Sequence, residues 1–163
     1  MGLFKKANPQ DAFEPYGFTI TETVLDPPRM TFLPAIYRDA DACRWAVKYR
    51  GAEPSIFSYG DILECEVVES GDVEEAEAVD KRDMAQQIIA NPARAARINA
   101  AKRNMCLGMG VIVAVRTGKD EVAKLQIPIM TGEVKRESPL YRRYRTAAEE
   151  LQETFESMRR AAA

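Results

Sequence analysis

A two-residue alternation of apolar and polar side chains recurs along the chain and limits what it can fold into. The alternation is clear in residues 18–24, 43–49 and 63–67. Because successive side chains of a strand point to opposite faces, this period predicts strands with one face buried and the other in water. The segments between them are too short for parallel crossovers, so the sequence predicts an antiparallel meander.

Prolines mark the expected limits of the sheet. Residues 30–37 are apolar but contain a proline, which predicts an edge strand or a bulge. Later in the chain, residues 111–116 and 125–129 are predicted to resume the sheet. Because a proline cannot donate to a strand ladder, Pro128 predicts that the second of these strands lies at an edge.

Helix signals interrupt this sheet between residues 70 and 107. Asn91-Pro92 places a capping side chain before a proline at the first helical position, and an alanine-rich run follows it. We therefore expect a helical insertion over about 70–107 that ends near Gly108. The Gly108-Met109-Gly110 segment precedes a strand and is predicted to be a turn, since phosphate-binding loops follow a strand instead.

A second helix is predicted at the end of the sequence, from Pro139 to about Arg160. Ser138 supplies its cap, and apolar side chains recur at spacings of three and four, which is typical of a face packed on a core. These side chains are Tyr144, Ala148, Leu151, Phe155 and Met158. The expected organisation is an α+β fold, with a flexible arm at 1–15 and a single domain at 16–163.

Composition restricts the available chemistry. The chain has 163 residues, a formal net charge of -2 and no histidine, which excludes histidine-based triads and most imidazole metal sites. The cysteines form no CxxC pair, and Cys43 and Cys65 fall on the apolar phase of predicted strands, as in a reduced cytoplasmic protein. No signal peptide or transmembrane segment is visible. We expect no catalytic residue, metal or cofactor.

Charge is unevenly distributed around the expected insertion. Asp61–Asp80 holds nine acids and no base, whereas Lys81–Met105 holds six bases and one acid. Glu74 and Glu77 could in principle bind a cation or act as acid and base, but the run lacks the spacing of a metal loop, so we interpret it as solvated. The bases of the insertion point in scattered directions without nearby aromatic residues, which disfavours nucleic-acid binding.

Residues 56–72, Ile-Phe-Ser-Tyr-Gly-Asp-Ile-Leu-Glu-Cys-Glu-Val-Val-Glu-Ser-Gly-Asp, resemble a segment of bacterial pleckstrin-homology-like domains of unknown function. The resemblance implies a bent antiparallel sheet, or partly open barrel, with a C-terminal capping helix. It also implies structural roles for Tyr59, Asp61 and Ile62. Asp61 would cap the turn through its carboxylate, with Tyr59 and Ile62 packed beneath it. Some relatives begin with a zinc ribbon that this chain lacks, and no catalytic residue carries over.

These observations favour a non-enzymatic binding or scaffolding module of the bacterial cytoplasm, which recognises a protein or peptide at the edge marked by Pro128. The alternative is a peripheral adaptor on a lipid surface, with no transmembrane segment. A hydrolase using Asp or Glu without histidine is a third hypothesis. The C-terminal helix could also mediate homo-oligomers. The candidate interaction residues are Lys5, Lys6, Arg94, Arg97, Lys102, Arg103 and Pro128.

Overall fold

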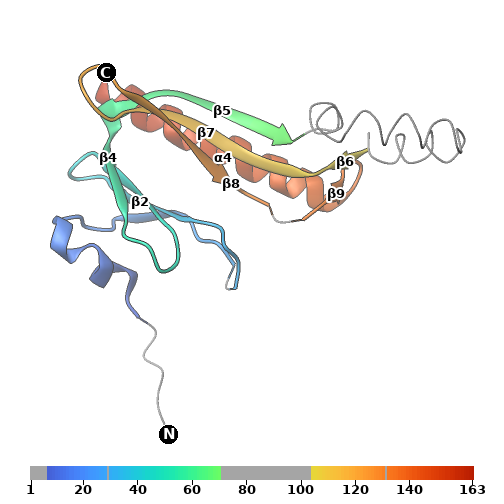
Figure 1. Ribbon diagram of the computed structural model, residues 1–163, viewed down its shortest axis with the longest axis horizontal. Coiled ribbons are helices and arrows are strands. Elements are labelled where there is room, and N and C mark those ends of the chain that lie inside the picture. Colours follow the sequence, from blue (N-terminus) through green and yellow to red (C-terminus); the bar gives the residue numbers. More distant parts are fainter. Residues whose placement is uncertain (1–6, 29, 71–103, 131) are drawn as a thin grey trace, which may run out of the picture.

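The computed structural model describes residues 7–28, 30–70, 104–130 and 132–163 (Figure 1). The predicted helical insertion therefore lies almost entirely outside the described residues. Its last residues are not helical, because Met105–Cys106 form strand β6, which pairs with β9 (Val134–Lys135). The expectation that a helix continues to Gly108 is corrected, since two backbone segments form a ladder there.

The first sheet is an antiparallel meander, as predicted, but its fourth strand is Ser55–Ser58, and the alternating residues 63–67 belong to the second sheet instead. The first sheet consists of β1 (Glu22–Leu25), β2 (Ala35–Asp39), β3 (Arg44–Lys48) and β4 (Ser55–Ser58), in that spatial order. β2 pairs with β1 and with β3, so the expected edge strand is an internal one. Pro34 lies just before β2, where its missing N–H removes no ladder hydrogen bond.

The second sheet contains β5 (Ile62–Ser70), β7 (Gly108–Arg116) and β8 (Val122–Pro128), with β7 in the middle. β8 is an edge strand, as Pro128 predicts. The predicted turn at Gly108-Met109-Gly110 is wrong, because these residues pair with β5. A Cβ atom on Gly110 would lie 2.6 Å from the carbonyl oxygen of Ile127, so glycine permits close approach of two backbones there.

Helix α4 (Pro139–Ala162) lies along the second sheet (Figure 1). Its start is as predicted, with the Ser138 hydroxyl accepting a hydrogen bond of 3.2 Å from the N–H of Tyr141. The predicted stripe is also confirmed, because Ala148, Leu151, Phe155 and Met158 are buried and Tyr144 is half-buried. No helix in the described part of the chain has the length and apolar character needed to cross a bilayer.

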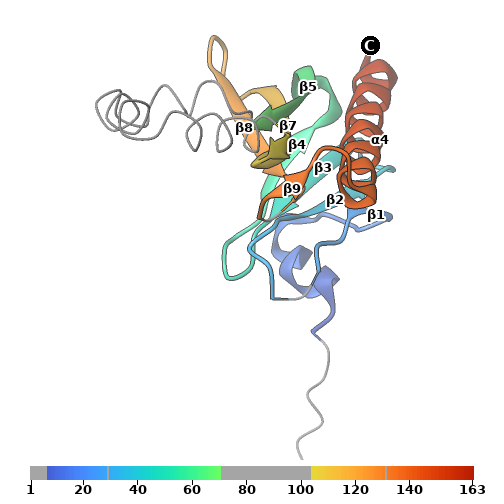
Figure 2. The ribbon, with the colours of Figure 1, turned by 90° about the vertical axis from the view of Figure 1, so that its right-hand side faces the viewer.

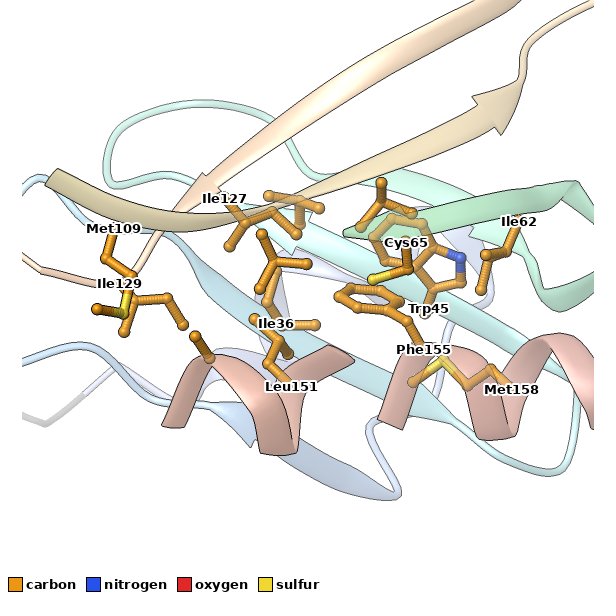
Figure 3. Packing of buried hydrophobic residues seen from close by; sticks show 14 of the residues in the cluster. Ile36, Trp45, Ile62, Cys65, Met109, Ile127, Ile129, Leu151, Phe155 and Met158 are labelled. Carbon is orange, nitrogen blue, oxygen red and sulfur yellow. The ribbon is translucent and has the colours of Figure 1, made fainter. Parts of the chain in front are cut away.

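The main core joins both sheets to α4 (Figure 3). At its centre the ring of Trp45 meets the ring of Phe155 edge to face at 4.8 Å, and both side chains are fully buried. Ile36 from β2 and Ile127 from β8 lie beside Leu151 in the same cluster. Residues from the two sheets therefore share one hydrophobic interior, which α4 closes.

A second, smaller core lies on the opposite face of the first sheet. Figure 2 shows the N-terminal segment beside this sheet. Phe13 and Phe18 pack there against Tyr37 and Ala46, with the Phe13 and Phe18 ring centroids 4.9 Å apart. Two short 3-10 helices, Pro9–Ala12 and Glu14–Tyr16, carry this segment. Within the described part of the expected flexible arm, Phe13 is thus packed on the sheet. The face of β3 that was expected to be in solvent is covered at Ala46.

Asp39 fixes this N-terminal segment to the β2–β3 turn. Its carboxylate is 2 % exposed and accepts hydrogen bonds from the N–H groups of Thr19 and Ala42, each 3.1 Å long. The Arg44 guanidinium lies 3.1 Å away and also donates to the carbonyl oxygen of Gly17. Burial by itself raises the pKa of Asp39, but these hydrogen bonds and the Arg44 charge outweigh it and hold that pKa below its usual range.

Replacing Asp39 with Asn is expected to lower the free energy of unfolding by about 1–2 kcal/mol at neutral pH, because a charge-assisted hydrogen bond becomes a neutral one. Since the folded pKa of Asp39 is depressed, its contribution is complete above the unfolded value of about 3.9 and is lost as pH falls through the lower folded value. Urea unfolding of both proteins at a series of pH values measures this difference. If the difference in free energy of unfolding between wild type and Asp39→Asn stays constant down to pH 2, the stabilising role of the Asp39 carboxylate is wrong.

The cysteines occupy two different environments. Cys65 and Cys106 are buried, and burial, followed by the charge of Glu156, raises the pKa of Cys65 to about 12. Cys43 was expected on the buried side of a strand, but it is exposed and lies in the turn before β3 with a φ of 52°. The turn places it in the left-handed region, so the alternation of β3 begins one residue later, at Arg44.

Candidate functional site

An open cleft of about 420 Å³ lies where the loop joining β1 to β2 meets the turn after β3. Its volume is within the range of ligand-binding pockets in proteins. The wall from the β1–β2 loop is mainly apolar, and the opposite wall comes from the end of β3 and the turn after it. The lining residues are Asp26, Pro27, Pro28, Met30, Thr31, Leu33, Ala35, Tyr37, Lys48, Tyr49 and Arg50.

The β1–β2 loop carries two almost completely exposed apolar side chains. Met30 is 90 % exposed and Phe32 is 92 % exposed, whereas Pro34 at the base of the loop is buried. The N–H and the hydroxyl of Thr31 both donate to the carbonyl oxygen of Pro28, at 3.4 and 2.7 Å. The loop therefore presents Met30 and Phe32 to solvent from a turn closed by its own hydrogen bonds.

Met30 is also unfavourable in its backbone. Its φ of 67° lies in the left-handed region, which a side chain as long as methionine rarely adopts. A strained backbone and an exposed apolar side chain both oppose folding stability, and such outliers concentrate at binding and catalytic sites. Both features coincide at Met30.

Three polar groups of the cleft make no hydrogen bond or ion pair with another described residue. They are the hydroxyl of Tyr37, the carboxylate of Asp26 and the guanidinium of Arg50. Burial, and then the charge of Asp26, raise the pKa of Tyr37, so its hydroxyl stays protonated as a donor. Lys48 instead donates to the carbonyl oxygens of Tyr49 and Ala52, which fixes its positive charge at the wall of the cleft.

The cleft can hold an apolar group and offer hydrogen bonds to it, but its side chains do not form a nucleophile–base pair. Asp39 is the buried carboxylate of the described residues, and its oxygens are occupied by the contacts given above. Within that part of the chain, no three Cys, Asp or Glu side chains are grouped to hold a metal ion.

The residues of the 56–72 segment have the predicted structural positions. Tyr59–Asp61 form a short 3-10 helix, and the Asp61 carboxylate accepts a hydrogen bond of 3.1 Å from the N–H of Ser58. Tyr59 and Ile62 are buried beneath this turn in the main core, and the Tyr59 hydroxyl accepts a 2.5 Å hydrogen bond from Arg38. These residues connect the two sheets and do not line the cleft.

Pro128 lies away from the cleft, on the free edge of β8. The N–H of Ile129 donates to the carbonyl oxygen of Met109 in β7. Along an antiparallel ladder, only every second residue of a strand is hydrogen-bonded to the same neighbouring strand. Pro128 and Lys124 therefore turn their backbone groups outward. Proline and lysine on an outward edge hinder the addition of a further strand, which makes this edge a poor docking site for a peptide. The other interaction candidates, Lys5, Lys6, Arg94, Arg97, Lys102 and Arg103, lie outside the described residues.

The opposite edge of this sheet is covered by α4. Gln152 donates to the carbonyl oxygen of Cys65 and Arg159 donates to that of Leu63, each at 3.1 Å. These carbonyl groups lie on the side of β5 that faces away from β7. The helix thus occupies the backbone positions that an added strand would need.

The cleft residues were missed by the sequence analysis. The apolar run at 30–37 was interpreted as a strand, because apolar side chains usually indicate burial. The available signal was the Asp26-Pro27-Pro28 turn followed by apolar residues without strict alternation. No family model, curated protein or solved structure matches the chain.

Proposed function

We propose that this protein is a non-enzymatic binding module that recognises a protein or peptide partner through the cleft and the β1–β2 loop. The exposure of Met30 and Phe32 on a loop closed by its own hydrogen bonds carries this proposal. Burying two such side chains against a partner supplies about 1.5–3 kcal/mol each. The hydrogen bonds from Thr31 to Pro28 already restrict the backbone beside Met30, which lowers the ordering cost of binding there.

We also infer that the domain is pleckstrin-homology-like. The order of its elements supports this inference: a four-stranded meander, then a three-stranded sheet, then a helix that closes the shared core. The interruption of the second sheet between β5 and β7 is compatible with the same plan, since a segment inserted between paired strands leaves their register intact. The binding proposal does not depend on this inference, because fold alone does not determine function.

A lipid surface is the second candidate, because exposed apolar side chains on a loop can also enter a bilayer. The cleft favours a protein partner. A concave site with separate donors and an acceptor recognises a shaped ligand, whereas a membrane offers a flat surface. Asp26 places a carboxylate at the cleft that would face anionic headgroups, and the chain has a formal net charge of -2.

The test compares two double variants as bait in lysate of the source organism. Met30→Ser with Phe32→Ser removes the apolar side chains of the loop, and Val122→Ser with Leu140→Ser removes two exposed apolar side chains elsewhere. Quantitative mass spectrometry should identify a protein that the wild type and the second variant retain and the first loses. Binding of the purified partner should then weaken at least about tenfold for the loop variant. Equal weakening by both variants, or no specific partner, would overturn the proposal.

A further inference from the structure

The charges of the cleft walls indicate which partner fits. Arg50 stands on the turn after β3 with an exposed side chain, and no hydrogen bond or ion pair from the described residues reaches it. Lys48 adds a second positive charge on the same wall. Asp26 belongs to the other wall, which the β1–β2 loop forms. Among the described residues, the wall at the turn is therefore positive, and the wall at the loop is mainly apolar with one carboxylate.

We propose that the partner segment is an acidic peptide in which an Asp or Glu side chain lies next to an apolar one. This inference rests on the proposed function. The carboxylate pairs with Arg50, whose planar guanidinium can make two parallel hydrogen bonds to it. The apolar side chain enters between Pro27, Leu33 and Tyr49, which line the cleft. The neighbouring Met30 and Phe32 cover the segment from outside.

The remaining polar groups define how the segment lies across the cleft. Asp26 accepts hydrogen bonds from N–H groups of the segment, and the Tyr37 hydroxyl donates to one of its carbonyl groups. The acidic end of the segment is thereby directed toward the turn after β3, away from Asp26. A reversed segment would place its carboxylate beside Asp26, where like charges repel.

The same arrangement opposes a phosphate group as the ligand. Asp26 and Tyr37 line the same cleft, so a phosphate bound by the Tyr37 hydroxyl would approach the negative charge of Asp26. Lys48 has its ammonium group committed to two backbone carbonyl oxygens. A single carboxylate needs only the one free guanidinium that Arg50 provides.

Selection of short random peptides on phage, with the full chain immobilised, tests the proposal. We expect the enriched peptides to share an Asp or Glu beside an apolar residue. A synthetic peptide of that consensus should bind Arg50→Ala about tenfold more weakly than the wild type, and Arg50→Glu more weakly still. Exchanging the peptide's acid for Lys should restore binding to Arg50→Glu. The matched control is Arg116→Glu, an exposed arginine at the end of β7 outside the cleft, which should change the affinity by less than about twofold.

The outcomes separate this inference from the function on which it rests. Peptides that bind the wild type, fail to bind Met30→Ser with Phe32→Ser, and yet show no acidic preference would overturn the inference and leave the binding module intact. An acidic preference that Arg50→Glu does not reduce would overturn it equally. If no peptide is enriched and the chain floats with phosphatidylcholine–phosphatidylserine vesicles, both proposals are wrong. Trp45 is fully buried, so its fluorescence verifies that each variant is folded.

Discussion

Replacing Phe155 with Ala is expected to lower the free energy of unfolding by about 3–5 kcal/mol. The side chain is fully buried where both sheets and α4 meet, and its ring packs against Trp45 at 4.8 Å. Truncation would leave a cavity that the strands on two sides cannot move to fill. The protein would therefore lose van der Waals contacts as well as buried apolar surface area. Guanidinium unfolding monitored by the fluorescence of Trp45, the one tryptophan in the sequence, measures the change.

Leu140→Ala is the matched control, because Leu140 belongs to the same helix but is 45 % exposed. It should change stability by no more than about 0.5 kcal/mol. Phe155→Leu keeps most of the volume and should fall between the two, which preserves the test if Phe155→Ala does not fold. Equal losses from Phe155→Ala and Leu140→Ala would mean that α4 does not close the core as described.

Gly110→Ala is expected to destabilise the protein by about 2–3 kcal/mol, although alanine commonly stabilises where the backbone accepts it. The added Cβ would lie 2.6 Å from the Ile127 carbonyl oxygen and 3.3 Å from the Cα of Pro128. Both are backbone atoms of β8, so the clash cannot be relieved by rotating a side chain. β7 and β8 would have to separate at this pair, and thermal unfolding followed by circular dichroism would report the loss.

Gly118 provides the corresponding control in the turn between β7 and β8. A Cβ atom there would lie 3.4 Å from the Glu121 carboxylate, which is at the far end of a flexible side chain. We expect Gly118→Ala to change stability by less than about 1 kcal/mol. A larger loss from Gly118→Ala than from Gly110→Ala would show that turn flexibility, and not strand contact, limits substitution here.

The sequence predicted those elements whose signals are local. The spacing of Ala148, Leu151 and Phe155 predicted the buried face of α4, because a helix and its partner surface depend on a single period. The Asp61 cap of the Tyr59 turn was also predicted, since the capping carboxylate and the N–H group that donates to it lie three residues apart. Both features need no knowledge of the rest of the chain.

Features that depend on contacts between distant segments were not predicted. Gly110 was interpreted as a turn residue, because nothing in its neighbourhood reveals that Ile127 approaches it closely. Phe13 lies among polar residues and prolines, so its burial against Tyr37 could not be inferred from local pattern. Residues far apart in the sequence decide these positions.

The cleft illustrates a different limit. Pattern analysis assigns apolar residues to the interior, so Met30 and Phe32 were placed in a strand. Met30 and Phe32 lie between the turn at Pro28 and the buried Pro34, and both point into solvent. A site made from solvent-exposed apolar side chains breaks the rule on which sequence analysis rests, and for this reason it is visible only in the fold.

The contacts of Gln152 and Arg159 with β5 also determine which part of β5 is exposed first when α4 begins to unfold. Helices fray from their ends, so Arg159 releases Leu63 before Gln152 releases Cys65. Molecules that lose only the last turn of α4 would therefore expose the carbonyl group of Leu63, while Gln152 and Phe155 keep their contacts. The exposed edge of β5 in such molecules can pair with a strand of another chain. We therefore expect variants truncated at the C-terminal end of α4 to aggregate.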